Sequence, residues 1–560
     1  MKIRSLHLLF AILFILLAGF LYYLQIFKGP AYKESSRKNS IRLLSIRAPR
    51  GVIYDRNGII TADNALAFSV FIVPQEAGDI DAEIKKISGI LGASESLLKR
   101  NYKRNYRAPF APCELMKNIS KREAILLEES KLDMPGVVIK EFPLRRYIYK
   151  DALAHVLGYT GEIDKRELEI LKSYGYSARD LIGKDGVEKI ADEVLRGKSG
   201  GMQVQVDNRG RQVKVLNLKR PRRGKDVYLT IDAGLQNFIW KAMEKRKGAV
   251  VFMDIHTGEV LSLISSPSYD PNESIARMLS DKGMPLLNRA IMGQYPPGSL
   301  FKVAVALAGL DTGKIDQRTS FTCRGKLKVG NGTFHCWNRD GHGVVDLHRA
   351  VSESCNVYFY NVGLLLGVDE MDKYARNFGF SKKTGIELQG ELGGFVPSRA
   401  WKKKEKGDSW YAGDTANLSI GQGYLLATPM QIGRFFACVA NNGTLVEPHI
   451  FKRPGGSKYE GVELGLKKEH LRAVKQAMLD VVDNAAGTGF RAWSDEIAIS
   501  AKTGTSQSGG GLKTHAWFAG FAPSDDPKIS FVVFLEHGGS GGADAAIIAK
   551  KAVEYWNRNR

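Results

Sequence analysis

An apolar run near the N-terminus is the first strong pattern in the chain. Residues 6–27 are nearly all Leu, Ile, Phe and Ala, and His7 and Gln25 are their only strongly polar side chains. About 20 apolar residues cross a bilayer as one helix, so residues 1–28 are predicted to form a short cytoplasmic tail and a transmembrane anchor. A cleaved signal peptide is the alternative, but it would show a shorter apolar run and a small-x-small cleavage site.

Strand-like and helix-like patterns alternate from about residue 226 to the C-terminus. A long, mainly helical stretch separates two groups of strands, and residues 543–556 predict a closing amphipathic helix. Strands from both ends of a domain that enclose a helical insert indicate one antiparallel sheet with helices against it, an α+β fold. Five segments predict the strands, namely residues 248–254, 259–265, 497–505, 515–522 and 529–536.

The region between the anchor and this domain has a different composition. Residues 29–225 mix charged helical stretches with short strands and gather no nucleophile, base and oxyanion donor, and a linker rich in Pro, Gly and Arg ends them. A chain of 560 residues is also too long for one ordinary domain. We therefore expect a spacer or docking domain over residues 29–225 and a catalytic domain over residues 226–560.

The chain is strongly basic, with a formal net charge of +22. Its Lys and Arg residues are spread over the whole sequence, and no recognised nucleic-acid motif accompanies them. A basic domain close to anionic lipid and an anionic wall polymer accounts for the charge equally well. Nucleic-acid binding is therefore not part of the predicted function.

The predicted chemistry begins at Ser299. Tyr295-Pro296-Pro297-Gly298 ends one segment and an apolar helix begins at Ser299, where free N–H groups and the helix dipole favour a developing negative charge. Lys302 lies one turn later on the same face. A lysine can activate a serine hydroxyl if burial or another cation lowers its pKa until it is neutral. Ser96 and Lys99 repeat this spacing, but we expect them on a solvated surface.

A second hydroxyl and an amide come from Ser354-Cys355-Asn356, which is the sole Ser-x-Asn of the chain. Ser354 is suited to relay a proton to a leaving amine, and Asn356 is suited to hydrogen-bond a substrate amide. Taken alone, the motif would be interpreted as an ordinary serine cap of a helix.

A second amine comes from Lys502-Thr503-Gly504-Thr505, which follows a strand-like segment. Lys502 at a sheet edge would depress the pKa of Lys302 and attract a substrate carboxylate. Gly504 would let a peptide lie close against the strand, and the N–H groups of Ser299 and Thr505 would form an oxyanion hole. Lys383-Thr384-Gly385 is a rival match in a polar turn, which we expect to be structural.

These three motifs, in this order, resemble the signature of penicillin-binding proteins and serine β-lactamases. The wider resemblance is to class B penicillin-binding proteins and runs from the anchor to the C-terminus, and it is greatest to the elongation-specific branch of that class. The segments that carry it are Arg50-Gly51, Asp55-Arg56-Asn57-Gly58, Gly421-Gln422-Gly423, His155-Val156-Leu157-Gly158-Tyr159 and residues 183–188 and 207–211.

The resemblance implies a penicillin-sensitive peptidoglycan D,D-transpeptidase, which cross-links stem peptides during cell elongation through an acyl intermediate on Ser299. It implies a five-stranded antiparallel sheet with helices, an elongated pedestal (dimerisation-type) domain before it, and a single span of the inner membrane with the catalytic domain on the periplasmic side. No cofactor is needed for this chemistry. The catalytic residues would be Ser299, Lys302, Ser354, Asn356, Lys502, Thr503 and Gly504, with Ser299 and Thr505 as oxyanion donors.

The same resemblance implies partners and leaves alternatives. The partners would be peptidoglycan stem peptides, β-lactams, and a SEDS-type glycosyltransferase with the elongation machinery. A division-specific class B transpeptidase and a β-lactamase or β-lactam sensor of the same fold are the nearest alternatives. A non-catalytic scaffold that binds wall peptides is a third, although the intact Ser299, Lys302 and Lys502 argue against it.

A cluster of cysteines and a histidine lies between the first two motifs. Gly330-Asn331-Gly332 suggests a hairpin that brings Cys323 and Cys336 together. Three thiolates and one imidazole make a sufficient tetrahedral set for a structural zinc ion. A Cys323–Cys336 disulfide and a merely buried Cys355 are alternatives that the sequence leaves open. The predicted zinc ligands are Cys323, Cys336, His342 and Cys355, with His335 as an alternate.

Overall fold

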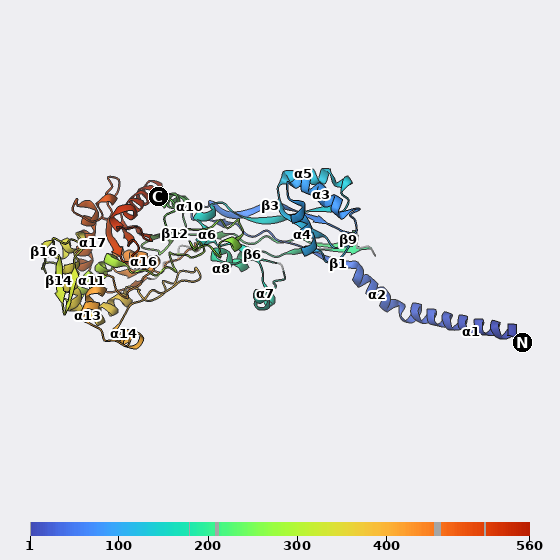
Figure 1. The fold of residues 1–560 in the computed structure, drawn as a ribbon, viewed down its shortest axis with the longest axis horizontal. Helices are drawn as coiled ribbons and strands as arrows, with labels where there is room; N and C mark the ends of the chain where they lie inside the picture. The colour runs from blue at the N-terminus through green and yellow to red at the C-terminus, as the bar shows by residue number, and fades with distance from the viewer. Residues whose placement is uncertain (1, 179, 208–211, 453–460, 509–510) are drawn as a thin grey trace. The chain divides into compact units, whose positions relative to one another are not determined.

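The computed structural model describes residues 2–178, 180–207, 212–452, 461–508 and 511–560 (Figure 1). Part of the motif at residues 207–211 therefore lies outside the described residues. The chain forms two compact units, and the first comprises Met1–Gly51, Asn64–Arg146 and Arg196–Lys225. The second comprises Val52–Asp63, Tyr147–Leu195 and Asp226–Arg560. Each unit is thus assembled from three separate segments of the sequence.

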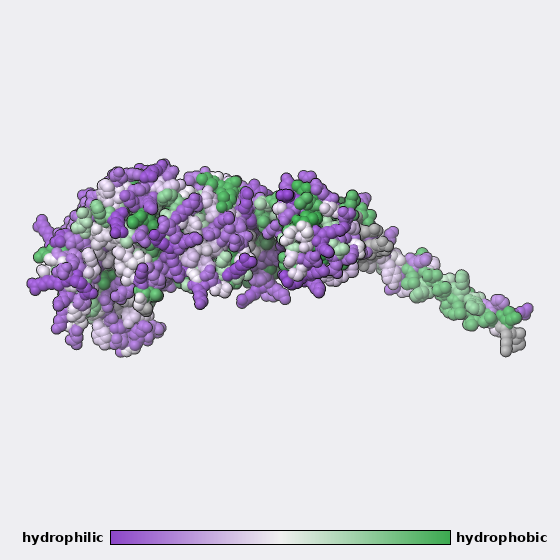
Figure 2. Space-filling model, turned by 45° about the horizontal axis from the view of Figure 1, so that its top comes forward, coloured by the Kyte–Doolittle hydropathy of each residue, from purple (hydrophilic) through white to green (hydrophobic). Residues whose placement is uncertain are grey.

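The predicted anchor is helical. Helix α1 (Lys2–Tyr22) continues into a π-helical turn, Tyr23–Phe27. The segment Ile3–Phe27 is long and apolar enough to cross a membrane, and none of its most apolar window is buried by protein. Figure 2 shows the apolar surface that runs along this helix. Because apolar side chains are unfavourable in water, a lipid bilayer is the environment that suits them.

The rest of the first unit combines two sheets with short helices. One sheet has the order β1-β8-β9, and the other pairs β3 with both β4 and β5. Val70, Leu98 and Leu127 are fully buried in the core between the second sheet and the helices. The elements are α2 (Gly29–Ser40), β1 (Ile41–Ile46), β3 (Ile60–Ile72), α3 (Ile80–Leu91), α4 (Glu95–Asn105), β4 (Cys113–Ile119), α5 (Lys121–Glu129), β5 (Val137–Tyr147), β8 (Gly200–Val206) and β9 (Gln212–Lys219).

Short elements precede the main sheet of the second unit. Gly158 and Asp185 come from two of the segments that carry the family resemblance, and a Cβ on Gly158 would lie 1.9 Å from the Asp185 carbonyl oxygen. Only glycine allows this backbone contact. The elements are β2 (Ile53–Tyr54), α6 (Ala154–Leu157), β6 (Thr160–Glu162), α7 (Lys165–Leu171), β7 (Leu181–Gly183), α8 (Gly186–Ile190), α9 (Asp192–Leu195), β10 (Val227–Tyr228) and α10 (Ala233–Ala242).

The main sheet has five antiparallel strands in the order β12-β11-β21-β20-β19, which confirms the predicted α+β fold. Val251 and Val532 face one core cluster and Val250 and Val533 face the other, so both faces of the sheet are covered. Burial on both faces explains why the central strands β11 and β21 are nearly continuous apolar runs. They are β11 (Gly248–Asp254), β12 (Val260–Ser266), β19 (Ser500–Ser506), β20 (His515–Ala522) and β21 (Ile529–Leu535).

The helical insert between β12 and β19 carries most of the predicted site. Its elements are α11 (Phe301–Asp311), β13 (Phe321–Cys323), β14 (Lys326–Val329), β15 (Gly332–His335), β16 (Gly343–Val345), α12 (Leu347–Ser352), α13 (Asn356–Asn377), α14 (Arg399–Lys406), α15 (Ala412–Ser419), α16 (Pro429–Ala440), β17 (Thr444–Leu445), β18 (Val462–Glu463) and α17 (Lys468–Asp483). The closing helix α18 (Ala546–Asn559) begins three residues later than the sequence predicts, after a π-helical turn at Gly541–Ala545.

Candidate active site

Ser299 lies in the 3-10 turn η6 (Gly298–Leu300), which leads directly into α11. The backbone of this turn is pressed against strand β19, because a Cβ on Gly298 would lie 2.9 Å from the Thr505 carbonyl oxygen. Gly298 also has φ +57°, a conformation that favours glycine. The Trp517 indole N–H donates to the carbonyl oxygen of Pro296 at 3.1 Å and holds the approach to the turn. Ser299 itself is half-buried.

Lys302 joins the first motif to the second. Its amine donates to the carbonyl oxygen of Ser354 at 2.8 Å, to Asn356 Oδ1 at 2.7 Å and to Ser354 Oγ at 3.3 Å. The side chain is fully buried and lies over the ring of Phe359. Because all three acceptors are neutral, they orient the amine without a counter-ion. The structure therefore brings Lys302, Ser354 and Asn356 together, as the sequence predicts.

Burial lowers the pKa of Lys302 to about 8, while the nearby thiolates of Cys355, Cys336 and Cys323 act in the opposite direction. Burial disfavours the charged form of an amine because the ammonium loses its hydration. A lysine with such a pKa is neutral in part of the population near neutral pH and is then able to accept a proton. Lys302 thus meets the requirement for a base beside a serine hydroxyl.

Lys502 lies on β19 and is also fully buried. Burial, and then repulsion from Lys302, holds its pKa well below the usual range. The sequence predicts that Lys502 lowers the pKa of Lys302, whereas the structure gives burial as the leading cause for both residues. Since repulsion acts on both members of an ammonium pair, this site favours having only one of them charged.

Strand β19 forms one edge of the sheet. The Thr503 carbonyl oxygen accepts from Lys502 Nζ at 3.2 Å, and the Thr505 carbonyl oxygen accepts from Gln422 Nε2 at 3.3 Å. A residue of an antiparallel strand points its N–H and C=O to the same side. The N–H groups of Thr503 and Thr505 therefore face away from β20, which suits Thr505 as an oxyanion donor and suits the edge for pairing with a peptide.

Close packing around Gly504 explains why position 504 is a glycine. A Cβ on Gly504 would lie 2.9 Å from Trp517 Cβ and 3.1 Å from both the Pro297 carbonyl oxygen and Leu300 Cγ. The absent side chain therefore makes room for the turn that carries Ser299. Sequence reasoning connects this glycine with a bound peptide instead.

The rival motifs lie elsewhere. The Thr384 hydroxyl and the Thr384 backbone N–H both donate to Glu391 Oε1, the N–H at 2.7 Å, so Lys383-Thr384-Gly385 is a turn bound to a buried carboxylate. Lys99 forms a surface ion pair of 2.7 Å with Asp81. Both motifs are structural, as expected.

The cysteine and histidine cluster is assembled by two hairpin-like pairs, β14 with β15 and β13 with β16. Ligand atoms of Cys323, Cys336, His342 and Cys355 all lie within 4.8 Å of one another, and all four residues are buried. The Cys323 and Cys336 sulfur atoms are each 3.5 Å from His342 Nδ1. The cysteines are free thiols, so the Cys323–Cys336 disulfide is not formed. His335 lies outside this cluster, and its carbonyl oxygen instead accepts from Asn356 Nδ2 at 3.2 Å.

The thiols of this cluster are electrostatically coupled. Hydrogen bonds from Cys355 and His342 lower the pKa of Cys336, while the same contact with Cys336 raises the pKa of Cys355. One shared proton between two sulfur atoms accounts for both directions. Such a cluster favours thiolate character, which is the form that binds metals.

Sequence reasoning missed a buried polar network behind the nucleophile turn. Glu536, at the end of β21, accepts from the Tyr295 hydroxyl at 2.5 Å and from Arg289 Nε at 3.0 Å, and it pairs with Lys247 at 2.9 Å. Tyr295 stands four residues before Ser299, so this network fixes the start of the turn. The available signal was a lone carboxylate directly after a fully apolar strand.

The comparisons with known families cover both compact units. Residues 248–554 match the family described as penicillin binding protein transpeptidase domain, and residues 45–229 match the penicillin-binding protein dimerisation domain. The peptidoglycan D,D-transpeptidase MrdA of Haemophilus influenzae is 34% identical, over 96% of this chain and 89% of its own length. The protein of the same name from Acinetobacter baumannii is 35% identical, over 95% of this chain and 84% of its own length.

Solved structures give the same picture. A complex between penicillin-binding protein 2 and MreC from Helicobacter pylori matches with a TM-score of 0.81 and 29% identity, over 93% of this chain and 99% of that one. Penicillin-binding protein 2 of Pseudomonas aeruginosa in complex with WCK 5153 matches with a TM-score of 0.70 and 31% identity, over 92% and 96%. A chain from a peptidoglycan synthase complex that coordinates polymerization and crosslinking matches with a TM-score of 0.76 and 28% identity, over 100% and 99%.

Proposed function

Because this chain belongs to the penicillin-binding protein transpeptidase family, we propose that the site around Lys302 performs the cross-linking of peptidoglycan during cell elongation. The enzyme is a serine-type D-Ala-D-Ala transpeptidase, like its relatives of 32–35% identity. The observation that carries the assignment is a buried amine held by Ser354 and Asn356 at 2.7–2.8 Å, one turn after Ser299. An enzyme of this reaction needs such an amine, whereas a wall-binding scaffold does not.

The proposed acylation uses this chain's own residues throughout. Neutral Lys302 accepts the hydroxyl proton of Ser299, and Ser299 Oγ attacks the carbonyl carbon of the penultimate D-Ala. The N–H groups of Ser299 and Thr505 hold the oxyanion. When the peptide C–N bond breaks, the proton passes from Lys302 through the Ser354 hydroxyl to the leaving nitrogen of the terminal D-Ala. The product is an ester on Ser299.

The second half-reaction reverses these roles. The amine of a neighbouring stem peptide attacks the ester carbonyl carbon, and its proton returns to the Ser299 oxygen as the C–O bond breaks. The donor stem peptide lies along the edge of β19, where the N–H groups of Thr503 and Thr505 face away from β20. The substrate carboxylate, once bound beside Lys502, supplies the negative charge that favours protonation of this buried amine and pairs with it. A β-lactam uses the same acylation route and remains as the ester.

The cellular role is tested by depletion of the protein. Loss of an elongation transpeptidase is expected to give round cells, because side-wall cross-linking stops while division continues. Cell width and length are measured by microscopy, with wild-type protein and the Ser96→Ala variant supplied from a plasmid as controls that restore rods. Filamentous cells would instead assign the protein to division.

We propose further that the protein spans the inner membrane once through Ile3–Phe27, with the transpeptidase on the periplasmic side, where peptidoglycan lies. Its proposed partners are a SEDS-type glycosyltransferase and the elongation machinery. The support comes from relatives, since penicillin-binding protein 2 of Helicobacter pylori forms a complex with MreC. Another similar chain belongs to a peptidoglycan synthase complex.

We propose that Cys323, Cys336, His342 and Cys355 hold a structural zinc ion. The fit rests on spacing, because a tetrahedral zinc with usual Zn–S and Zn–N bonds separates its ligand atoms by about 3.5–3.8 Å. The two S···N distances of 3.5 Å agree with this value. When bound, the ion would supply rigidity, since Cys355 stands between Ser354 and Asn356.

Purified protein is therefore expected to contain about one zinc per chain, and Cys336→Ala should remove it. The loss of a structural metal destabilises the fold, so the Tm should fall by more than about 5 °C. Metal analysis and thermal unfolding check this. Cys438→Ala is the matched control, because Cys438 is equally buried but stands outside the cluster. Equal zinc contents in the two variants would contradict the proposal.

A further inference from the structure

Ser354 has an unusual backbone conformation. It follows the end of α12 with φ +56°, in the left-handed region. The Cys355 N–H donates to the Ala350 carbonyl oxygen at 3.0 Å, and the Ser354 N–H donates to the Val351 carbonyl oxygen at 3.3 Å. This pair of bonds is the Schellman end of a helix, in which glycine normally occupies the left-handed position. Ser354 occupies it here, so surrounding contacts must hold the turn in place.

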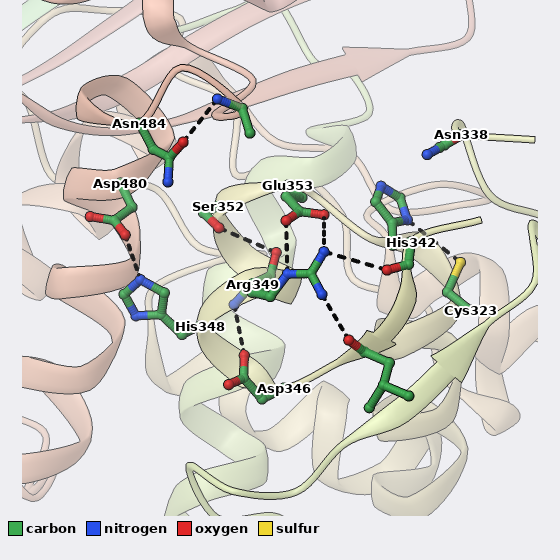
Figure 3. A network of polar contacts seen from close by, with 12 residues as sticks. Cys323, Asn338, His342, Asp346, His348, Arg349, Ser352, Glu353, Asp480 and Asn484 are labelled. Carbon is green, nitrogen blue, oxygen red and sulfur yellow. Dashed lines mark hydrogen bonds and ion pairs between the residues drawn. The ribbon is translucent and has the colours of Figure 1, made fainter. Parts of the chain in front are cut away.

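Arg349 makes most of those contacts (Figure 3). Its guanidinium forms two hydrogen bonds to the Glu353 carboxylate, at 2.9 and 3.1 Å. The same group donates to the carbonyl oxygens of Val344 at 2.8 Å and His342 at 3.4 Å. Arg349 thus ties the strand that ends the cysteine and histidine cluster to the residue directly before Ser354. The fork geometry of arginine allows this set of bonds, and a lysine cannot reproduce it.

Two further contacts restrain the same helix. The Trp337 indole N–H donates to the Glu353 carbonyl oxygen at 3.0 Å. On the other side of α12, His348 Nε2 lies 2.7 Å from Asp480 of α17, as Figure 3 also shows. His348 therefore restrains the start of α12, while Arg349 and Trp337 restrain the residues after its end, and Arg349 makes four of these bonds.

We propose that Arg349 is a positioning residue for the acyl transfer: by clamping Glu353 to the backbone at His342 and Val344, it keeps Ser354 in the left-handed turn that presents its hydroxyl to Lys302. Without the clamp, the turn relaxes toward an ordinary helical or frayed end. The Ser354 hydroxyl oxygen then leaves its position 3.3 Å from the Lys302 amine, while Asn356 Oδ1 still accepts from that amine at 2.7 Å. This inference rests on the proposed function, in which Ser354 hands the proton to the leaving nitrogen.

The leaving group provides a readout that a general loss of structure would not change. Benzylpenicillin expels an amine nitrogen, which needs a proton, whereas a thioester substrate expels a thiolate, which does not. Arg349→Met is expected to slow acylation by benzylpenicillin about tenfold or more, and acylation by the thioester less than about threefold. Arg349→Lys should fall between Arg349→Met and the wild type.

Arg376→Met is the matched control. Arg376 also pairs with a carboxylate one helical turn away, Asp372 at 2.8 Å, and donates to the Val396 carbonyl oxygen at 3.4 Å. Its side chain is 42% exposed, compared with 47% for Arg349, but it stands at the far end of α13. Its acylation rates should equal those of the wild type with both substrates.

Ser354→Ala completes the test. Its acylation by benzylpenicillin should slow far more than its acylation by the thioester. The double variant Ser354→Ala with Arg349→Met should be acylated by penicillin no more slowly than Ser354→Ala alone, because both changes affect the same proton transfer to the leaving nitrogen. Zinc content and Tm are measured on the same samples. Equal losses on both substrates, additive losses, or a loss that follows zinc content would overturn the proposal. A wild-type protein that penicillin does not acylate would refute the proposed function instead.

Discussion

Ser299→Ala is expected to abolish covalent labelling by a fluorescent penicillin, with a fall in the acylation rate of at least about a thousandfold. The substitution removes the oxygen that forms the ester, and the half-buried side chain has no neighbour that could replace it in the turn before α11. Because only one oxygen atom is lost, the free energy of unfolding should change by less than about 1 kcal/mol. Labelling is read on a gel, and thermal unfolding checks the fold.

Ser96→Ala is the control for this variant, because Ser96 and Lys99 repeat the Ser-x-x-Lys spacing outside the site. Ser96 is exposed, and Lys99 forms an ion pair with Asp81. This control should label like the wild type and restore rod shape in depleted cells, whereas Ser299→Ala should do neither. Persistent labelling of Ser299→Ala would assign the nucleophile to another residue, which a digest of the labelled protein would identify.

The main sheet is predictable from sequence because β11, β20 and β21 are mostly apolar and bounded by turn residues. β20 and β11 have the predicted limits. β19 begins at Ser500 rather than at residue 497, although Ile497 and Ile499 continue the apolar pattern. Ser500 pairs with Phe521, and Pro523 follows soon after on the partner strand. Since proline has no N–H to donate, the ladder ends there, and an apolar pattern alone does not reveal this.

The sequence predicts which residues form the candidate site, but it does not predict which of their atoms contact one another. The spacing of motifs predicts that Lys302 meets Ser354 and Asn356, because each motif alone lacks a partner. It does not predict that Lys302 binds the Ser354 backbone carbonyl, since that contact depends on a left-handed serine. For a similar reason, the sequence does not predict the ion pair between Arg289 and Glu536. Contacts between distant residues follow from packing of the whole unit, which local patterns do not encode.

Lys302→Met is expected to lower the acylation rate by about a thousandfold, because it removes the proton acceptor while keeping an unbranched side chain only one atom shorter. The fold should tolerate the change. The Ser354 carbonyl and Asn356 Oδ1 lose a donor, which costs about 1–3 kcal/mol for each buried group. Removal of a buried amine, whose charged form is disfavoured by burial, offsets part of this cost. Rapid mixing with a chromogenic β-lactam measures the rate.

Lys475→Met is the matched control for this substitution. Burial also lowers the pKa of Lys475 to about 8, and its amine likewise donates to a backbone carbonyl, that of Ala440, and to an asparagine, Asn442, both at 2.8 Å. It packs beside Phe521 rather than in the motif cluster. The two variants therefore remove similar amines from similar surroundings. Only Lys302→Met should lose acylation, so a comparable loss in both would indicate general damage from deleting a lysine whose pKa is lowered by burial.

The pH dependence separates a base from a binding residue. Lys302 accepts a proton only when it is neutral, so the wild-type acylation rate should rise with pH and level off above its pKa of about 8. The neutral fraction is about a tenth at pH 7 and about nine tenths at pH 9, which predicts a rise of nearly tenfold. The residual rate of Lys302→Met should lack this rise, whereas Lys475→Met should retain it. If the acylation rate of Lys302→Met still rose between pH 7 and pH 9, the base that titrates would have to be another group. Lys502, the second buried amine of the site, would then be the next residue to replace.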